Sequence, residues 1–73
     1  GYFVFEEASL EEILERLSRW YNVDVFFSSE KVKTYHFTGH MEKYEDVEVI
    51  LRAINKMVNV HFVLKDRTIV VTE

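Results

Sequence analysis

Residues 9–27, with the sequence SLEEILERLSRWYNVDVFF, read as an amphipathic helix that ends at an asparagine and passes directly into a strand. The chain repeats this pattern 37 positions later, in residues 46–64, DVEVILRAINKMVNVHFVL. The periodicity predicts a duplicated helix–strand unit in which both helices bury the same face. The apolar positions match throughout: Leu10 and Val47, Ile13 and Ile50, Leu14 and Leu51, Leu17 and Ile54, Trp20 and Met57, and Tyr21 and Val58.

Signals at both ends delimit the first helix. Ser9 and Glu12 have the spacing of a capping box, in which the serine hydroxyl accepts from a free helix N–H and the glutamate reaches back. Asn22 tolerates the left-handed conformation that commonly ends a helix. We therefore expect a helix over residues 10–21, with the glutamates of its outer face solvated rather than catalytic.

The second helix is predicted by the same reasoning to begin after Asp46 and to run to about Val58, with Asn59 ending it. At two outer positions where the first helix carries charges, the second carries Val49 and Ala53. Its apolar stripe is therefore wider, and we expect it to be the more buried of the two helices.

Five stretches have the composition of strands, bounded by polar or turn-forming residues. Gly39 inside the third indicates a bulge or a close backbone approach, and Asp66 lies in a hairpin turn. Together with the helices, these strands predict an α+β fold of duplicated βαβ units, with two helices packed against small mixed β-sheets. We expect residues 1–73 to form a single domain with the order β-α-β-β-α-β-β, its strands at residues 2–6, 23–27, 34–43, 60–64 and 68–72.

Composition excludes several classes of function. The 73 residues carry a net charge of −4 with lysines and arginines scattered singly, which disfavours nucleic-acid binding. The chain has no cysteine, so neither disulfides nor thiolate metal sites can form. No apolar run approaches the ~20 residues that span a bilayer. Gly1, followed at once by a strand-like run, is typical of an expression remnant on an excised domain, so we expect a longer parent protein.

The candidate chemistry is sparse. His36 and His40 share a strand face but would lie about 13 Å apart, too far for one metal ion unless a bulge folds them together. A metal- or small-ligand-binding enzyme domain would further require His61 to converge with them. The sequence contains no nucleophile elbow and no phosphate-binding glycine loop. We therefore expect no enzymatic activity, no catalytic residue, no cofactor and no metal site.

Outward-facing apolar residues are the remaining candidates for function. Phe26 and Val63 occupy equivalent repeat positions and alternate away from the inward residues, as do Val4 and, less clearly, Val70. Such residues are either covered by a second layer of the fold or used to contact a partner. The sequence leaves these two explanations open.

The chain resembles the C-terminal domain of FecR-family anti-sigma regulators, in the version common in Bacteroidetes-type bacteria. The resemblance is carried by the capped start of the first helix, by RWYNV at residues 19–23 and by FTG at residues 37–39. The closing Ile69-Val70-Val71 strand also fits. That domain is in turn similar to the secretin and TonB short N-terminal domain, another duplicated βαβ unit.

This resemblance implies a non-enzymatic periplasmic signalling and protein-interaction domain. The parent would be a transmembrane anti-sigma factor, anchored in the inner membrane, whose cytoplasmic segment holds a sigma factor. Its periplasmic domain would receive the signal from the signalling domain of an outer-membrane TonB-dependent transporter. The alternative implied by the resemblance is the signalling domain of such a transporter itself, or a secretin ring domain.

The residues shared with the family are a helix cap, core positions, a helix end and a bulge, so none can be transferred as a binding site. From the residues themselves, the partner-binding candidates are outward positions on the second and third strands. These are Phe26, His36, Thr38 and His40.

Overall fold

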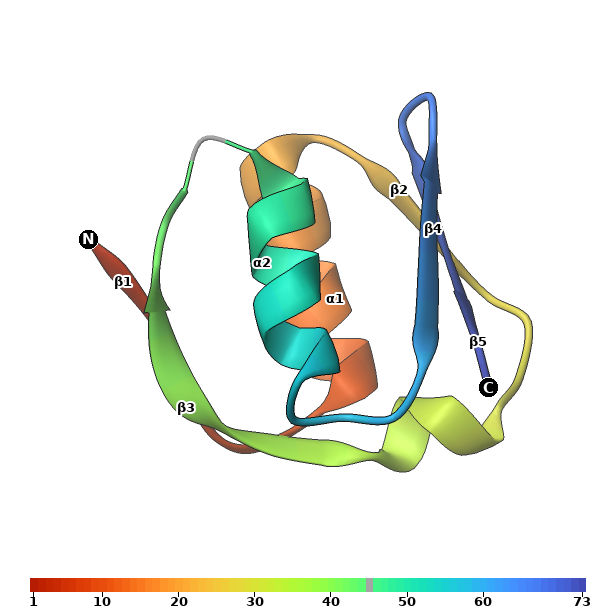
Figure 1. Cartoon of the computed structure of the whole chain (residues 1–73), viewed down its shortest axis with the longest axis horizontal. Helices are drawn as coiled ribbons and strands as arrows, with labels where there is room; N and C mark the ends of the chain where they lie inside the picture. Colours follow the sequence, from red (N-terminus) through yellow and green to blue (C-terminus); the bar gives the residue numbers. More distant parts are fainter. Residues whose placement is uncertain (45) are drawn as a thin grey trace.

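The computed structural model describes residues 1–44 and 46–73, and the order of its elements is the one predicted from the sequence. Within these residues no helix is long and apolar enough to cross a membrane. The fold is α+β, with two helices and two small sheets (Figure 1). The elements are β1 (Tyr2–Ser9), α1 (Leu10–Tyr21), β2 (Asp24–Phe27), a 3-10 turn η1 (Lys31–Thr34), β3 (His36–Glu42), α2 (Val47–Asn55), β4 (His61–Lys65) and β5 (Thr68–Thr72).

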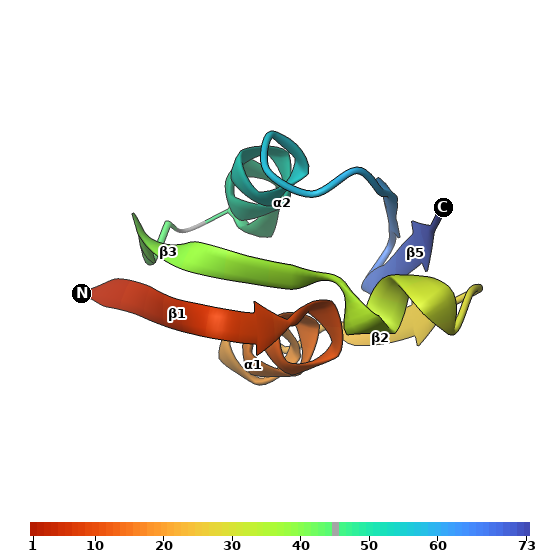
Figure 2. The ribbon, with the colours of Figure 1, turned by 90° about the horizontal axis from the view of Figure 1, so that it is seen from below.

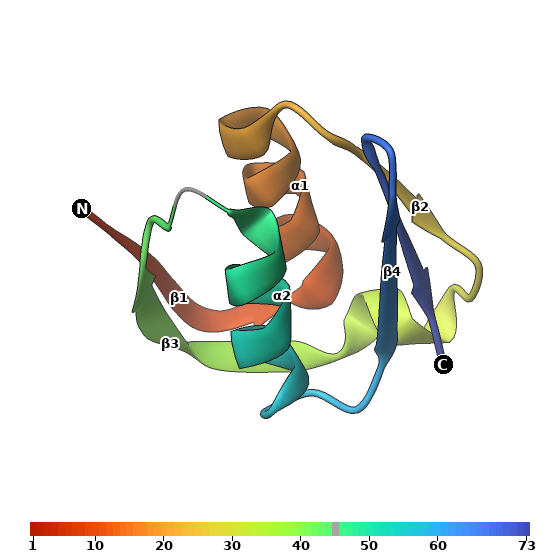
Figure 3. The same ribbon diagram turned by 45° about the horizontal axis from the view of Figure 1, so that its top comes forward.

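The two repeats interleave to build the sheets. Their leading strands, β1 and β3, pair antiparallel in a two-stranded sheet. Their trailing strands, β2 and β4, lie on either side of β5 in a mixed three-stranded sheet, in which β2 is parallel and β4 antiparallel to β5. The helices lie between the two sheets (Figures 2 and 3). Each sheet therefore contains strands from both halves of the duplicated sequence.

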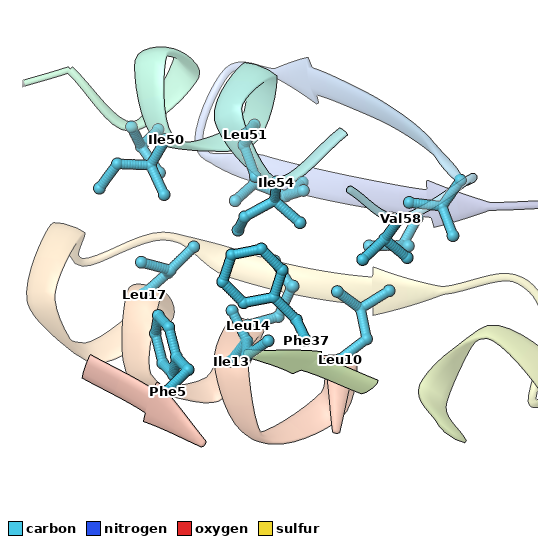
Figure 4. Packing of buried hydrophobic residues seen from close by; sticks show 14 of the residues in the cluster. Phe5, Leu10, Ile13, Leu14, Leu17, Phe37, Ile50, Leu51, Ile54 and Val58 are labelled. Carbon is cyan, nitrogen blue, oxygen red and sulfur yellow. The ribbon is translucent and has the colours of Figure 1, made fainter. Parts of the chain in front are cut away.

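The core fills the space between the helices and the inner faces of the sheets (Figure 4). The repeat prediction is confirmed at four positions in each helix, which are all buried: Leu10, Ile13, Leu14 and Leu17 of α1, and Val47, Ile50, Leu51 and Ile54 of α2.

The repeat prediction is wrong for the pair Trp20 and Met57, whose side chains are 56% and 69% exposed. Trp20 stands at the rim of the core, with its ring edge-to-face against Phe3 at a centroid distance of 6.0 Å. Met57 follows the end of α2, so no helical face directs its side chain inward.

The end of α2 also differs from the prediction. The helix stops at Asn55, three residues before the expected Val58, and Asn59 does not cap it. The Asn55 side-chain amide donates to the carbonyls of Val58 and Val60, at 3.2 and 2.6 Å. These bonds stabilise a tight turn in place of the last helical turn.

The wider burial predicted for α2 is confirmed. Val49 and Ala53 are half-buried, whereas Glu12 and Arg16 at the equivalent positions of α1 are exposed. The charge-to-apolar replacements between the two copies therefore coincide with a real difference in environment.

The irregularity expected at Gly39 lies on the opposite strand. The register between β1 and β3 shifts between Phe5 and Ala8, where Glu7 has a φ of 46°. Gly39 instead provides a close approach, because a Cβ there would lie 3.0 Å from the ring of Phe37. Phe37 is a core residue, so the small residue leaves room for its ring.

The N-terminal cap of α1 leads to a first prediction. The Ser9 hydroxyl accepts from the Glu12 N–H at 3.1 Å, and the Glu12 carboxylate accepts from the Ser9 N–H at 3.1 Å. Ser9→Ala should lower the free energy of unfolding by about 1 kcal/mol, measured by urea denaturation. Ser9→Thr, which retains a capping hydroxyl, is the control and should stay close to the original protein. An unchanged midpoint for Ser9→Ala would contradict a stabilising cap.

The same cap makes stability depend on pH in a defined direction. The hydrogen bonds from Ser9 lower the pKa of Glu12 below its ordinary value of 4.5. A carboxylate with a lowered folded pKa stabilises the fold above its unfolded pKa, and this contribution is lost as the pH falls through the folded pKa. In Ser9→Ala the pKa of Glu12, followed by NMR titration, should therefore rise.

Candidate protein-interaction surface

Three apolar side chains line up across the outer face of the three-stranded sheet. Phe26 of β2 is the register partner of Val70 on β5, and Val70 is the partner of Val63 on β4. Phe26 and Val63 are 59% and 54% exposed, and Val70 between them is half-buried. We call these three residues the outer apolar row. Since Phe26 and Val63 stay more than half exposed, the row is left uncovered within the described part of the chain.

The outer apolar row arises from strand alternation. Val25 and Phe27 flank Phe26 and point to the opposite face, where they pack against the core. The row is framed by polar rows, with Asp24 and Lys65 next to Thr68 on one side and His61 next to Thr72 on the other. An apolar centre with a polar rim is the usual anatomy of a protein-binding surface.

A groove adjoins the row at the free edge of β2. It has a volume of about 690 Å³ and lies between β2 and the outer side of α1. β2 is an outer strand, paired only with β5, and Figure 2 shows it beside α1. We call this the β2 groove; it is lined by Glu11, Glu15, Ser18, Arg19, Asp24, Val25, Phe26, Phe27, Glu30 and Lys33.

The β2 groove is acidic. Four of its lining side chains are carboxylates and two are cationic. One of the cations is already engaged, because Lys33 Nζ lies 3.1 Å from Glu30 and 3.7 Å from Glu11. The hydrogen bond with Glu30 raises the pKa of Lys33 above its ordinary value. Glu15 and Asp24 have no partner of this kind among the described ion pairs.

The four residues predicted from the sequence do not form one surface. Phe26 belongs to the three-stranded sheet, whereas His36, Thr38 and His40 lie on β3 in the other sheet, where all three are exposed. Thr38 holds the bulge of β1 by accepting the Glu7 N–H at 2.8 Å. Sequence alternation identified the outward positions, but only strand pairing separates them into two sheets.

The outer face of the β1–β3 sheet is a second, less apolar candidate surface. Val4 and Tyr2 are exposed there, and Val4 is the register partner of His40. His40 lies edge-to-face with Tyr2 at a ring-centroid distance of 5.8 Å. On this face of the β1–β3 sheet, no apolar row lies between two polar rows. The outer apolar row of the three-stranded sheet is therefore the stronger candidate site.

A cluster of cations and aromatic rings at the rim of the core was not predicted from the sequence. Lys43 Nζ lies 4.3 Å from the ring centroid of Trp20 and 5.3 Å from that of Phe3. Arg16 lies 5.1 Å above Phe5 and donates to the Val4 carbonyl at 3.2 Å. Because these cations already contact rings and backbone of the same domain, the cluster is best explained as packing.

The three histidines do not converge. His36 and His40 lie on β3, while His61 lies on β4 in the other sheet. Among the residues that the structure describes, no group of three His, Cys, Asp or Glu side chains is placed to hold a metal ion. The candidate site with the clearest geometry is the outer apolar row together with the adjoining β2 groove.

Comparison with known proteins identifies the family of the chain and a structure with the same fold. The sequence model of the family "FecR, C-terminal" matches residues 2–71, and the chain belongs to this family. No curated protein sequence matches this chain. Two crystal structures of a proposed anti-sigma factor from Parabacteroides distasonis ATCC 8503 have the same fold, each with a TM-score of 0.86 at 19% identity.

The structural match covers the two proteins unequally. The whole of this chain aligns with those structures, but it spans only 34% of that protein's length. At this identity the likeness establishes the fold alone. Family membership assigns the domain to regulatory signalling and confirms the resemblance seen in the sequence.

Proposed function

We propose that the domain is the periplasmic signal-receiving module of a FecR-type anti-sigma factor anchored in the inner membrane. In this proposal residues 1–73 act as one docking domain for the signalling domain of an outer-membrane TonB-dependent transporter. The cytoplasmic segment of the longer parent holds the sigma factor and releases it in response. The role requires a binding surface and no catalysis. Family membership supports it, together with the match to a proposed anti-sigma factor.

The outer apolar row is the observation that carries the proposal. Phe26 and Val63, exposed on either side of the half-buried Val70, are unfavourable in water, and covering them stabilises a complex by roughly 25 cal/mol per Å² of apolar surface. Aromatic residues at the centre of such a patch usually contribute most to binding. Phe26 is the aromatic residue of the row and lies at its end, where it also lines the β2 groove, so we assign the centre of the combined docking surface to Phe26.

The alternative roles, a transporter signalling domain or a secretin ring domain, share the fold but receive less support. The matching family is that of the FecR C-terminal domain, over nearly the full chain. The reading frame of the parent separates the roles directly. A membrane helix upstream of this domain supports the regulator, whereas a plug and barrel downstream would contradict it.

Truncation of Phe26 tests the docking surface. Phe26→Ala should weaken binding to the transporter signalling domain by at least about 30-fold, as expected for a binding hot spot, in calorimetric titration. Its stability should change little, because the side chain is 59% exposed. Tyr2→Ala is the matched control, since Tyr2 is an aromatic residue of similar exposure on the other sheet. Unchanged affinity for Phe26→Ala would overturn the assignment.

The second candidate surface is tested in the same titration. The residues proposed there, His36, Thr38 and His40, are truncated by the double variant His36→Ala/His40→Ala and by Thr38→Ser, which preserves the hydroxyl that holds the bulge. We expect binding close to that of the original protein. A larger loss than for Phe26→Ala would move the docking surface to the β1–β3 sheet.

A further inference from the structure

The outer edge of β2 has backbone groups that the fold does not use. The β2–β5 ladder is closed by the Asp24 N–H, which donates to the Arg67 carbonyl at 2.7 Å, and by the Ser28 N–H, which donates to the Val71 carbonyl at 3.0 Å. Backbone groups alternate in direction along a strand. The N–H and C=O groups of Val25 and Phe27 therefore point away from β5, toward the β2 groove.

These groups are free to pair with another chain. Within the described residues no backbone or side-chain hydrogen bond outside the ladder reaches Val25 or Phe27. An outer strand with a row of free donors and acceptors is a template for an added strand. The adjoining groove of about 690 Å³ gives such a strand room to lie beside β2.

The internal duplication supplies a comparison within the same molecule. The equivalent position in the second repeat is the groove between β4 and α2, lined by Glu48, Leu51, Arg52, Asn55, Phe62 and Leu64. Its volume is only about 100 Å³. Its charged side chains, Glu48 and Arg52, balance, whereas their counterparts in the β2 groove are Glu11 and Glu15. The two copies have thus diverged at the edge of the trailing strand, and only the first copy leaves an open acidic groove.

The charge of the β2 groove selects its occupant. A second copy of this chain would bring the same carboxylates against themselves, and each copy carries a net charge of −4. A basic segment would meet Glu15 on α1 and Asp24 on β2, which belong to no ion pair among the described residues. Its side chains alternate, so that those beside Phe26 join the outer apolar row while their neighbours point toward α1.

We propose that the β2 edge binds an extended basic segment of the partner protein as a fourth strand of the β2–β5–β4 sheet. This inference rests on the proposed function, in that the domain docks a protein. It adds the chemistry of the bound segment, in which apolar side chains alternate with lysine or arginine. The backbone of Val25 and Phe27 holds the strand, and the carboxylates of the β2 groove select its charge.

The edge is tested with peptides, independently of any transporter. The probe is an acetylated and amidated peptide of alternating lysine and valine, titrated into the ¹⁵N-labelled domain. We expect amide hydrogen exchange of Val25 and Phe27 to slow at least about tenfold at saturation. The first control is the same peptide N-methylated at every residue, which keeps the charge but removes all backbone donors. The second control replaces every lysine by glutamate. Neither control should slow exchange.

Three outcomes of the peptide experiment would overturn the inference. One is equal protection of the Val25 and Phe27 amides by the N-methylated peptide, which would show that charge attraction alone causes the protection. Another is protection of Phe62 and Leu64 on β4 in place of Val25 and Phe27. The third is no protection by the lysine–valine peptide at any concentration.

A pair of variants tests the edge against the natural partner. Val25→Pro removes the outward N–H but no ladder bond, a substitution that outer strands tolerate. Val25→Ala removes a similar amount of side chain and keeps the N–H. Val25→Pro should bind the transporter signalling domain at least about tenfold more weakly than Val25→Ala. Equal binding by both variants would overturn strand addition at β2 but leave the proposed docking intact. If the original protein fails to bind the signalling domain, the proposed function is rejected, and the peptide experiment alone then decides whether the β2 edge accepts a strand.

Discussion

Replacing Leu14 by alanine is expected to lower the free energy of unfolding by about 3 kcal/mol. Leu14 is completely buried and lies where α1 faces α2 across the core (Figure 4). The substitution removes apolar contact and leaves a cavity that the neighbouring helix cannot fully close. A chain of this size is stable by roughly 4–11 kcal/mol in total, so the variant should unfold at a much lower urea concentration. Circular dichroism across a urea titration measures the change.

Met57→Ala is the matched control for the core substitution. Met57 occupies a repeat position whose periodicity predicts burial, yet its side chain is 69% exposed. We expect a change within about 0.5 kcal/mol, as for most surface substitutions. Similar losses for Leu14→Ala and Met57→Ala would contradict the observed difference in burial.

Replacing Asn55 by alanine is expected to destabilise the domain by about 2 kcal/mol. The Asn55 amide donates to the carbonyls of both Val58 and Val60, and the substitution leaves these acceptors without this partner. The turn between α2 and β4 depends on those bonds, so amide exchange in residues 56–60 should accelerate more than elsewhere. Urea denaturation gives the global effect and exchange gives its location.

Asn59→Ala separates the two explanations for the end of α2. The repeat pattern assigns the terminating role to Asn59, the counterpart of Asn22, whereas the structure assigns it to Asn55. Asn59 is exposed, and its replacement should change stability by no more than about 0.5 kcal/mol. A larger effect for Asn59→Ala than for Asn55→Ala would restore the explanation based on the repeat.

The elements that were predictable from the sequence are those with local signals. The first helix begins at its Ser9 cap and ends before Asn22, which adopts the left-handed conformation with φ 55°. Strand alternation correctly assigned the faces of Val25, Phe26 and Phe27. The end of α2 was not predictable from the repeat. Ser18, the counterpart of Asn55, makes the equivalent of only one of its bonds, by donating to the Val23 carbonyl, whereas Asn55 donates to the Val58 carbonyl as well as to that of Val60.

The candidate site shows where sequence reasoning stops. The outward direction of Phe26 followed from alternation, but its alignment with Val70 and Val63 depends on the pairing of β2 with β5, which are far apart in the sequence. Glu11 and Glu15 read as a solvated helix face in the sequence. The tertiary structure places them opposite the free edge of β2, where the same carboxylates line a groove.

The interleaving of the repeats bears on how such a domain could have arisen. Because β1 pairs with β3 and both trailing strands flank β5, half of the chain contains no complete sheet. A single strand–helix–strand unit would leave both of its strands unpaired and the apolar face of its helix open to water. Two units in one chain pair their leading strands, but their trailing strands meet only through β5, which lies outside the repeat. A duplication alone would therefore not have completed the fold, because the second sheet also requires the closing strand.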